Sequence, residues 1–339
     1  MAGEYTYQEI MSQPEAWHEA LGYIETQARA IKAIRLADYD EVIFTGCGST
    51  YYLAVAAATL MRESTGMASR GLPASEIWLY AKAAYNQSKN TLLIAVSRSG
   101  TTTETLRAVE SFKANAKGTV LTLTCYPEST LATSGQSNLV FRSGQEQSIA
   151  QTRAFTVLYL ATVALIRLWT NQDISALYSL SEICGQILTQ SAGQVKRLGT
   201  DARFERFYFL GSGARYGLAC ELSLKMKEMT LSHSEPFHFL EFRHGPQSMA
   251  NENTLMIGLI SEQNSAAERA VLEEMKARGA HVLGLANHNA DITFASQLET
   301  LFHNVLYLPA IQLMAFERSL SKGLDPDKPL NLTAVVILD

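Results

Sequence analysis

Short apolar runs, rich in β-branched residues, alternate along the chain with longer segments whose apolar residues recur at helical spacing. The runs at 41–45 (EVIFT), 91–96 (TLLIAV) and 119–124 (TVLTLT) are separated by helical patterns at 51–63 and 104–116. Strands that are apolar along most of their length are typical of a parallel sheet with helices on both faces. The first half of the chain is therefore predicted to be an α/β unit.

The same order of elements returns in the second half. The runs at 42–48, 90–94 and 119–123 are echoed at 207–213, 253–257 and 281–285, at offsets between 162 and 165 residues. Three elements in one order at nearly one offset indicate an internal duplication, here of a doubly wound, flavodoxin-like parallel sheet flanked by helices. The predicted divisions are a helical lead-in at 1–34, a first subdomain at 35–170, a connecting helix at 171–198 and a second subdomain at 199–339.

Small hydroxyl side chains gather where two strands of the first half end. GCGST at 46–50 follows one strand, and SRSGTTT at 97–103 follows the next. Ligands of open parallel sheets bind at the carboxyl ends of the strands, and helix N-termini with small hydroxyls suit phosphate. The same residues could simply be helix N-caps. The first half has two such loops, whereas the matching segments of the second half, GSGAR and SEQ, contain fewer hydroxyl side chains. This difference favours a phosphate site in the first half.

Composition and charge exclude several classes of protein. A net charge of −5 without a Lys/Arg run does not suggest nucleic-acid binding. Neither a GxGxxG fingerprint nor a Walker A loop occurs, so no nucleotide cofactor is expected. The four cysteines are scattered and give no metal site. No run is long enough for a membrane span and no signal peptide is evident, so a cytoplasmic protein is expected.

A second concentration of chemistry lies at 221–246, ELSLKMKEMTLSHSEPFHFLEFRHGP. Glu221, Lys225 and Glu228 are spaced i, i+4, i+7, so they share one helix face beside an apolar stripe. Several further proton-transfer groups follow: His233, Glu235, His238, Glu241 and His244. A solvated helix face with ordinary ion pairs accounts for the spacing equally well.

Together these motifs resemble a known family. The duplicated halves, the GCGST and SRSGTTTET loops and the stretch from KMKE to FRHGP are similar to the sugar isomerase (SIS) phosphosugar-binding family over nearly the whole chain. The chain looks most like the isomerase half of glucosamine-6-phosphate synthase and its stand-alone relatives, the amino-sugar-6-phosphate deaminases and isomerases. FRHGPQS at 242–248 is more similar to the galactosamine-6-phosphate type. The nucleophilic cysteine of the synthase's glutaminase half is not found near the start, so amidotransfer from glutamine is not expected.

The resemblance implies a role for each matching residue. Glu228 matches the base that moves a proton between C1 and C2 of the sugar, with Glu221 and Lys225 beside it. His244 matches a histidine that helps open the sugar ring, which relatives offer from the partner subunit of a dimer. Gln151 and Thr152 match a segment that lines the sugar. The positions that hold the 6-phosphate or shape its loops are Ser49, Thr50, Ser97, Arg98, Ser99, Gly100 and Thr102.

The implied chemistry needs neither metal nor cofactor. A carboxylate on a rigid, partly desolvated helix can transfer a proton between C2 and C1, and a histidine suits the proton shift that opens the ring. One departure concerns the synthase's lysine that forms a Schiff base with the open-chain sugar, because Ala334 occupies that place here. A covalent imine step of that kind is not expected.

The sequence therefore predicts an enzyme: a homodimeric amino-sugar-6-phosphate deaminase/isomerase with shared active sites, acting on the gluco or the galacto sugar. Two alternatives stay open. One is a deglycase that cleaves a sugar-6-phosphate–amine conjugate through similar enolisation. The other is a sugar-phosphate sensor without turnover, which would require neither Glu228 nor His244.

Overall fold

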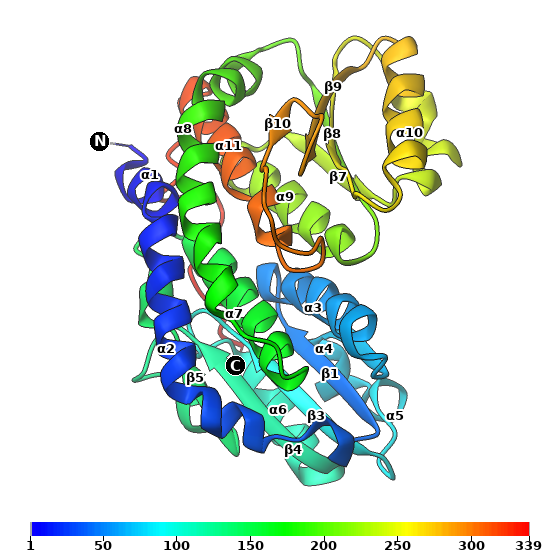
Figure 1. Ribbon diagram of the computed structural model, residues 1–339. Helices are drawn as coiled ribbons and strands as arrows, with labels where there is room; N and C mark the ends of the chain where they lie inside the picture. The colour runs from blue at the N-terminus through cyan, green and yellow to red at the C-terminus, as the bar shows by residue number, and fades with distance from the viewer. Residues whose placement is uncertain (1, 339) are drawn as a thin grey trace. The chain divides into compact units, whose positions relative to one another are not determined.

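The computed structural model describes residues 2–338, which divide into two compact units. Unit 1 comprises 2–14, 147–152 and 179–332, and unit 2 comprises 15–146, 153–178 and 333–338. Each contains one parallel five-stranded sheet flanked by helices (Figure 1). Within 2–338, no helix combines the length and the apolar composition needed to cross a membrane.

The sheet of unit 2 has the strand order β2-β1-β3-β4-β5, with every neighbouring pair parallel. Thr45 lies opposite Ala95, so β1 and β3 end side by side and the loops that follow them share one edge. The strands are β1 (Glu41–Gly46), β2 (Ser69–Pro73), β3 (Asn90–Val96), β4 (Lys117–Thr124) and β5 (Ser137–Val140).

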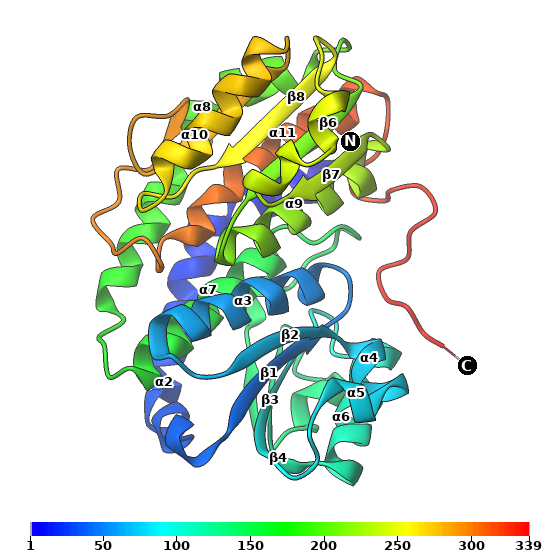
Figure 2. The same ribbon diagram turned by 90° about the vertical axis from the view of Figure 1, so that its right-hand side faces the viewer.

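Helices cover both faces of this sheet (Figure 2). On one face, Ile77 of α4 and Phe112 of α6 pack against Ile43 and Leu93 of the strands. On the other, α3 packs against α7, which is tied to α2 by a 2.9 Å hydrogen bond from Trp17 Nε1 to Thr156 Oγ1. The helices are α2 (Gln13–Ala33), α3 (Ser49–Thr65), α4 (Ala74–Leu79), α5 (Ala81–Ala84), α6 (Thr103–Asn115) and α7 (Arg153–Trp169).

Unit 1 repeats this plan. Its strand order β10-β9-β8-β6-β7 is the order of unit 2 read from the other edge, again wholly parallel. The strands are β6 (Arg206–Gly211), β7 (His233–Phe237), β8 (Thr254–Leu259), β9 (His281–Ala286) and β10 (Ile292–Thr293). The helices are α1 (Glu4–Met11), α8 (Ser179–Thr200), α9 (Ala214–Thr230), α10 (Ser265–Ala277) and α11 (Pro309–Ser321).

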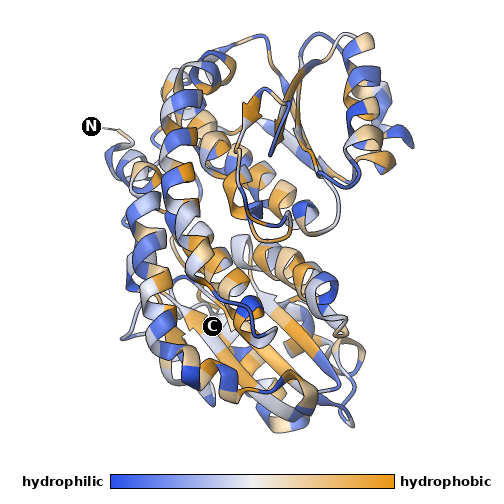
Figure 3. Cartoon of the chain, viewed as in Figure 1, coloured by the Kyte–Doolittle hydropathy of each residue, from blue (hydrophilic) through white to orange (hydrophobic). Residues whose placement is uncertain are grey.

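The two faces of the unit 1 sheet are covered by different helices (Figure 2). Met275 of α10 packs with Phe242 against Tyr208 and Met256 on one face. Helix α9 lies along β6 and β7 on the other face, where α11 and α8 pack behind it. The central strands of both sheets are hydrophobic along their length (Figure 3), as burial on both faces requires.

The predicted fold class is confirmed: the chain holds two duplicated, doubly wound α/β sheets in the 2-1-3-4-5 order of flavodoxin-like proteins. The strands expected from apolar runs, in both halves, are all present. The edge strands β2, β5, β7 and β10 were not predicted. The stretch around His233, for which no strand was predicted, forms β7 at the sheet edge.

Candidate active site

The first hydroxyl loop of unit 2 connects β1 to α3. Gly48 adopts φ 55° at the N-cap of α3, a conformation that favours glycine. Thr50 Oγ1 accepts a hydrogen bond from the Cys47 N–H and donates one to the Cys47 carbonyl, both at 3.0 Å. Ser49 and Thr50 are buried, and a Cβ on Gly46 would come within 2.5 Å of Thr50 Oγ1. The turn is therefore tightly closed at the helix N-terminus.

The second loop, between β3 and α6, brings three predicted hydroxyls together. Thr102 Oγ1 lies 3.3 Å from Ser97 Oγ and 3.5 Å from Ser99 Oγ. Ser97 Oγ accepts from the Gly100 N–H at 3.1 Å, and Gly100 has φ 66° with no room for a side chain beside Ser129. Thr102 is the N-cap of α6 but its hydroxyl makes no capping hydrogen bond. The N-cap interpretation therefore does not account for this hydroxyl cluster.

The two loops meet at one edge of the sheet, as predicted from the parallel order. Cys47 Sγ of the first loop lies 3.5 Å from Thr105 Oγ1 on the first turn of α6. Burial raises the pKa of the Cys47 thiol, so this cysteine is not an activated nucleophile. Hydroxyls and the N-termini of α3 and α6 thus converge, an arrangement that suits an anion.

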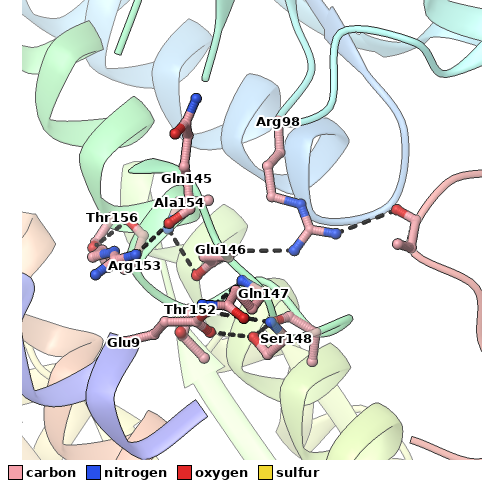
Figure 4. Close-up of polar contacts among 12 residues, drawn as sticks. Glu9, Arg98, Gln145, Glu146, Gln147, Ser148, Thr152, Arg153, Ala154 and Thr156 are labelled. Atoms are coloured by element: carbon pink, nitrogen blue, oxygen red, sulfur yellow. Dashed lines mark hydrogen bonds and ion pairs between the residues drawn. The ribbon is translucent and has the colours of Figure 1, made fainter. Parts of the chain in front are cut away.

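Arg98, a predicted phosphate ligand, is bound to a carboxylate of the same unit (Figure 4). Its side chain is buried and donates from NH1 to Glu146 Oε2 at 3.0 Å. The Glu146 side chain is wholly buried and also accepts from the Ala154 N–H at 3.0 Å through its other oxygen. The guanidinium is therefore held beside the loop by a carboxylate that sequence reasoning missed.

The C-terminal segment of unit 2 also touches this loop. Arg98 NH2 donates to the Ala334 carbonyl at 3.2 Å, and the Thr103 N–H, at the start of α6, donates to the Val336 carbonyl at 3.3 Å. Thr103 Oγ1 in turn accepts from the Leu338 N–H at 3.0 Å. Ala334, at the position where the resemblance implies a Schiff-base lysine in the synthase, thus contributes its backbone oxygen to the Arg98 side chain.

In unit 1, the predicted row on α9 forms a compact charged group. Lys225 Nζ lies 2.5 Å from Glu228 Oε2 and 3.4 Å from Glu221 Oε1. Lys225 and Glu221 are buried, whereas the Glu228 side chain keeps 20% of its surface exposed. The row is therefore not a solvated helix face. Glu228 is the member of the group that a ligand can reach.

Two further predicted residues lie on the segment 147–152 of unit 1. Its backbone is anchored by the buried Glu9 of α1, whose Oε1 accepts from the Gln147 N–H at 2.6 Å (Figure 4). The Thr152 carbonyl accepts from Gln312 Nε2 at 3.1 Å. Gln151 Oε1 is buried and has no hydrogen-bond partner among residues 2–338. A buried amide oxygen without a protein partner can be satisfied by a water molecule or by a ligand.

His244 stands apart from the α9 group. It is exposed, at the end of a 3-10 turn (Leu240–Arg243), and its neighbour Phe242 packs under α10 on the other face of the sheet. Its side chain has no hydrogen bond or ion pair within 2–338. The imidazole of His238 stacks on the ring of Tyr216, with the ring centroids 3.9 Å apart, and partial desolvation lowers the pKa of this imidazole.

The structure thus assembles two of the predicted sets separately. Ser97, Ser99 and Thr102 come together in unit 2, while Glu221, Lys225 and Glu228 come together in unit 1. Glu146 and Glu9 have clear structural roles that no local pattern indicated. The class defined by the fold is a duplicated doubly wound α/β protein, with hydroxyl side chains gathered at one set of strand ends.

Comparison with known proteins agrees with this class. The SIS domain matches residues 35–168 and 201–310. The chain belongs to the SIS domain family.

Several of the similar proteins are named as enzymes that act on sugar phosphates. A glutamine–fructose-6-phosphate aminotransferase (isomerizing) from Methanothermobacter thermautotrophicus is 27% identical over 99% of this chain, which spans 58% of that relative. The structure of glucosamine-6-phosphate deaminase from Thermotoga maritima is 26% identical with a TM-score of 0.86, covering 99% of this chain and all of the other. Tagatose-6-phosphate ketose/aldose isomerase from Escherichia coli, at 23% identity, shares the fold with a TM-score of 0.88 over 99% of this chain and 96% of its own.

Proposed function

We propose that the protein is a phosphosugar isomerase/deaminase that converts glucosamine 6-phosphate or galactosamine 6-phosphate to the ketose 6-phosphate and ammonia. The observation that carries the proposal is the α9 group, in which a buried ammonium holds one oxygen of the partly exposed Glu228 carboxylate. The other oxygen is available to a substrate. A fixed carboxylate of this kind is the usual base for proton transfer next to a carbonyl.

In the proposed reaction, Glu228 removes the proton from C2 of the open-chain amino sugar, and the electron pair forms a C1–C2 double bond. The C1=O π pair moves onto O1, which takes up a proton from solvent, giving an enolamine. The same carboxyl then returns the proton to C1 while the nitrogen lone pair forms a C2=N bond, and the nitrogen gives up one proton to solvent, which leaves an imine at C2. Water adds to this imine, and ammonia departs as the C2 ketone forms. The sum is one water consumed and one ammonia released, with no change of oxidation state overall.

Other residues have supporting roles in the proposal. Lys225 fixes the direction of the Glu228 carboxylate, and Glu221 balances the charge of Lys225. Ser97, Ser99 and Thr102, together with Ser49 and Thr50, hold the 6-phosphate, while Arg98 supplies positive charge beside it. Gln151 and Thr152 line the sugar. His244 opens the ring from the partner subunit of a homodimer, which its exposed position permits.

The similar protein named glucosamine-6-phosphate deaminase supports this choice within the family. The test is ammonia release from glucosamine 6-phosphate and galactosamine 6-phosphate, side by side, with Glu228→Gln and the control Glu235→Gln. We expect ammonia from one sugar, lost in Glu228→Gln and kept in the control. If both sugars raise the melting temperature without ammonia release, a deglycase or a sensor replaces the proposal.

A further inference from the structure

A separate, wide-open surface cavity of about 1110 Å³ lies in unit 2, at the edge of the sheet opposite the hydroxyl loops. Its lining includes the first residues of β1 and β2 and the segment 82–89 that leads into β3. Because the strands are parallel, these residues mark the amino ends of β1, β2 and β3, whereas the loops at 46–50 and 97–102 follow the carboxyl ends. The cavity is therefore distinct from the proposed phosphate site.

The lining carries a strong excess of positive charge. Arg62, Arg70, Lys82 and Lys89 face a single carboxylate, Glu41. Arg70 NH2 pairs with Glu41 Oε2 at 3.1 Å, so three cationic side chains are left without a compensating carboxylate in the lining. The whole chain has a net charge of −5, and this cavity is thus a local positive field in an acidic protein.

The three remaining cations are available to a ligand. Arg62 NH1 donates to the Ser69 carbonyl at 2.7 Å and NH2 to Thr59 Oγ1 at 3.4 Å, which fixes the guanidinium without neutralising it. The ammonium groups of Lys82 and Lys89 make no hydrogen bond or ion pair with any described residue. Both lysines are exposed, so binding an anion requires no disruption of the fold.

Tyr85 gives an independent indication of a ligand. It lines the cavity, is only 3% exposed, and packs edge-on against Phe112 at 5.4 Å in the core under α6. Its buried hydroxyl has no hydrogen-bond partner within residues 2–338. Native proteins rarely leave a buried hydroxyl unsatisfied, and an acceptor oxygen entering the cavity would supply the partner.

We propose that this cavity binds a small polyanion with two or more phosphate groups, such as a diphosphate or a sugar bisphosphate. Its volume of about 1110 Å³ is slightly above the range of about 300–1,000 Å³ that is usual for small-molecule sites, so it has room for a molecule with more than one phosphate. An arginine fork with two lysine ammonium groups is a recurrent means of binding phosphates. Tyr85 is the only aromatic residue in the lining and its ring is packed in the core, so no stacking surface for a nucleobase is present there.

The test is calorimetric titration of the full chain with inorganic pyrophosphate at low salt. The Lys82→Gln/Lys89→Gln variant should lose at least about tenfold in affinity. A matched variant with two exposed lysines outside the cavity, Lys32→Gln/Lys113→Gln, should bind as the wild type does. Equal losses in both variants, or no binding to the wild type, would overturn the proposal.

Two more variants separate this site from the proposed active site. Tyr85→Phe removes only the unpartnered hydroxyl and should weaken pyrophosphate binding by about three- to tenfold while leaving the melting temperature unchanged. Ser97→Ala/Thr102→Val should leave pyrophosphate binding at the cavity intact even if it abolishes turnover. Loss of pyrophosphate binding in this last variant would assign the anion to the hydroxyl loops and overturn the proposal. Tighter binding of a poly-glutamate peptide than of pyrophosphate would also overturn it, because the cavity would then be a groove for acidic peptides.

Discussion

At the scale of single residues, burial decides which of several charged groups can react. Glu221, Lys225 and Glu228 have the spacing of an ordinary solvated ion-pair row, and sequence alone cannot separate the two cases. In the structure Glu221 and Lys225 are buried and Glu228 is partly exposed, and for this reason the proposal uses Glu228, not Glu221, as the base. The same applies to Arg98, whose buried partner Glu146 is 48 residues away in the chain and follows no local pattern.

Lys225→Met should destabilise the protein. The change removes an ammonium that lies 3.4 Å from the buried Glu221, and breaking a buried ion pair from one side costs about 3–5 kcal/mol. Urea unfolding followed by circular dichroism measures the loss. The exposed Lys227→Met, on the same helix, should change the free energy of unfolding by no more than about 0.5 kcal/mol. Equal effects of the two changes would mean that Lys225 is not paired as described.

Glu146→Gln should weaken both folding and phosphate binding in unit 2. It leaves the buried Arg98 guanidinium without its counter-charge, at a cost of about 3 kcal/mol. Trp17, Trp78 and Trp169 all belong to unit 2, so tryptophan fluorescence during urea unfolding reports on this unit directly. A matched exposed change, Glu110→Gln on α6, should have no measurable effect. Unchanged stability in Glu146→Gln would contradict a structural role for the pair.

At the scale of elements, the sequence predicts the buried central strands but not the strands at the edges of the sheets. Runs such as TLLIAV are apolar because β3 is covered on both faces, and that property can be read directly. The edge strands β2 (SRGLP), β5 (SNLV) and β7 (HSEPF) are short and partly polar, and β2 and β7 also contain Gly or Pro, so their sequences resemble loops. Their strand pairing comes from the tertiary fold.

The corresponding strand ends of the two units differ in the side chains that surround their backbone N–H groups. In unit 1, Glu268 Oε2 accepts from the Ser261 N–H at 2.5 Å, and the buried Arg215 lies 3.9 Å from the same carboxylate. At the equivalent edge of unit 2, the offset of 165 residues places Thr50 at the position of Arg215. The offset of 163 residues places Thr105 at the position of Glu268. An internal carboxylate thus serves one strand end, whereas the other has hydroxyls suited to an external anion.

This difference predicts that one half of the duplication binds phosphate. Ser97→Ala/Thr102→Val should weaken binding of a sugar 6-phosphate by at least about tenfold, because it removes two hydroxyls at the N-terminus of α6. Ser261→Ala, at the corresponding strand end of unit 1, should leave the affinity unchanged. The melting-temperature shift caused by glucose 6-phosphate measures the affinity of each variant. A larger effect of Ser261→Ala would place the phosphate in unit 1 and contradict the prediction.

At the scale of the whole molecule, the proposal requires two copies of the chain. The SIS fold and its duplication could be recognised from the sequence, but the burial of Glu221 and the exposure of His244 could not. His244 belongs to a segment packed under α10, whereas Glu228 projects from α9 on the opposite face of the sheet. If His244 comes from a partner copy, it can act on the same sugar as Glu228 although the two residues lie on opposite faces of the sheet within one chain.

Mixing two inactive variants tests the shared site. Glu228→Gln and His244→Ala homodimers should each be inactive, and after mixing and subunit exchange about a quarter of wild-type ammonia release should return, because half of the dimers then contain one intact site. Sedimentation analysis verifies that dimers are present. No recovery despite demonstrated exchange would mean that His244 and Glu228 act from the same chain or that His244 has no role.

The most direct test of the central claim, that Glu228 moves a proton between C2 and C1 of an amino-sugar 6-phosphate, is hydrogen exchange in D₂O followed by proton NMR. The wild-type protein should introduce deuterium at C2 of the recovered substrate or C1 of the ketose product. Glu228→Gln should do so about 10²–10⁴-fold more slowly while still showing a melting-temperature shift with the sugar. Exchange at the wild-type rate in Glu228→Gln, or none in the wild type despite binding, would contradict the account.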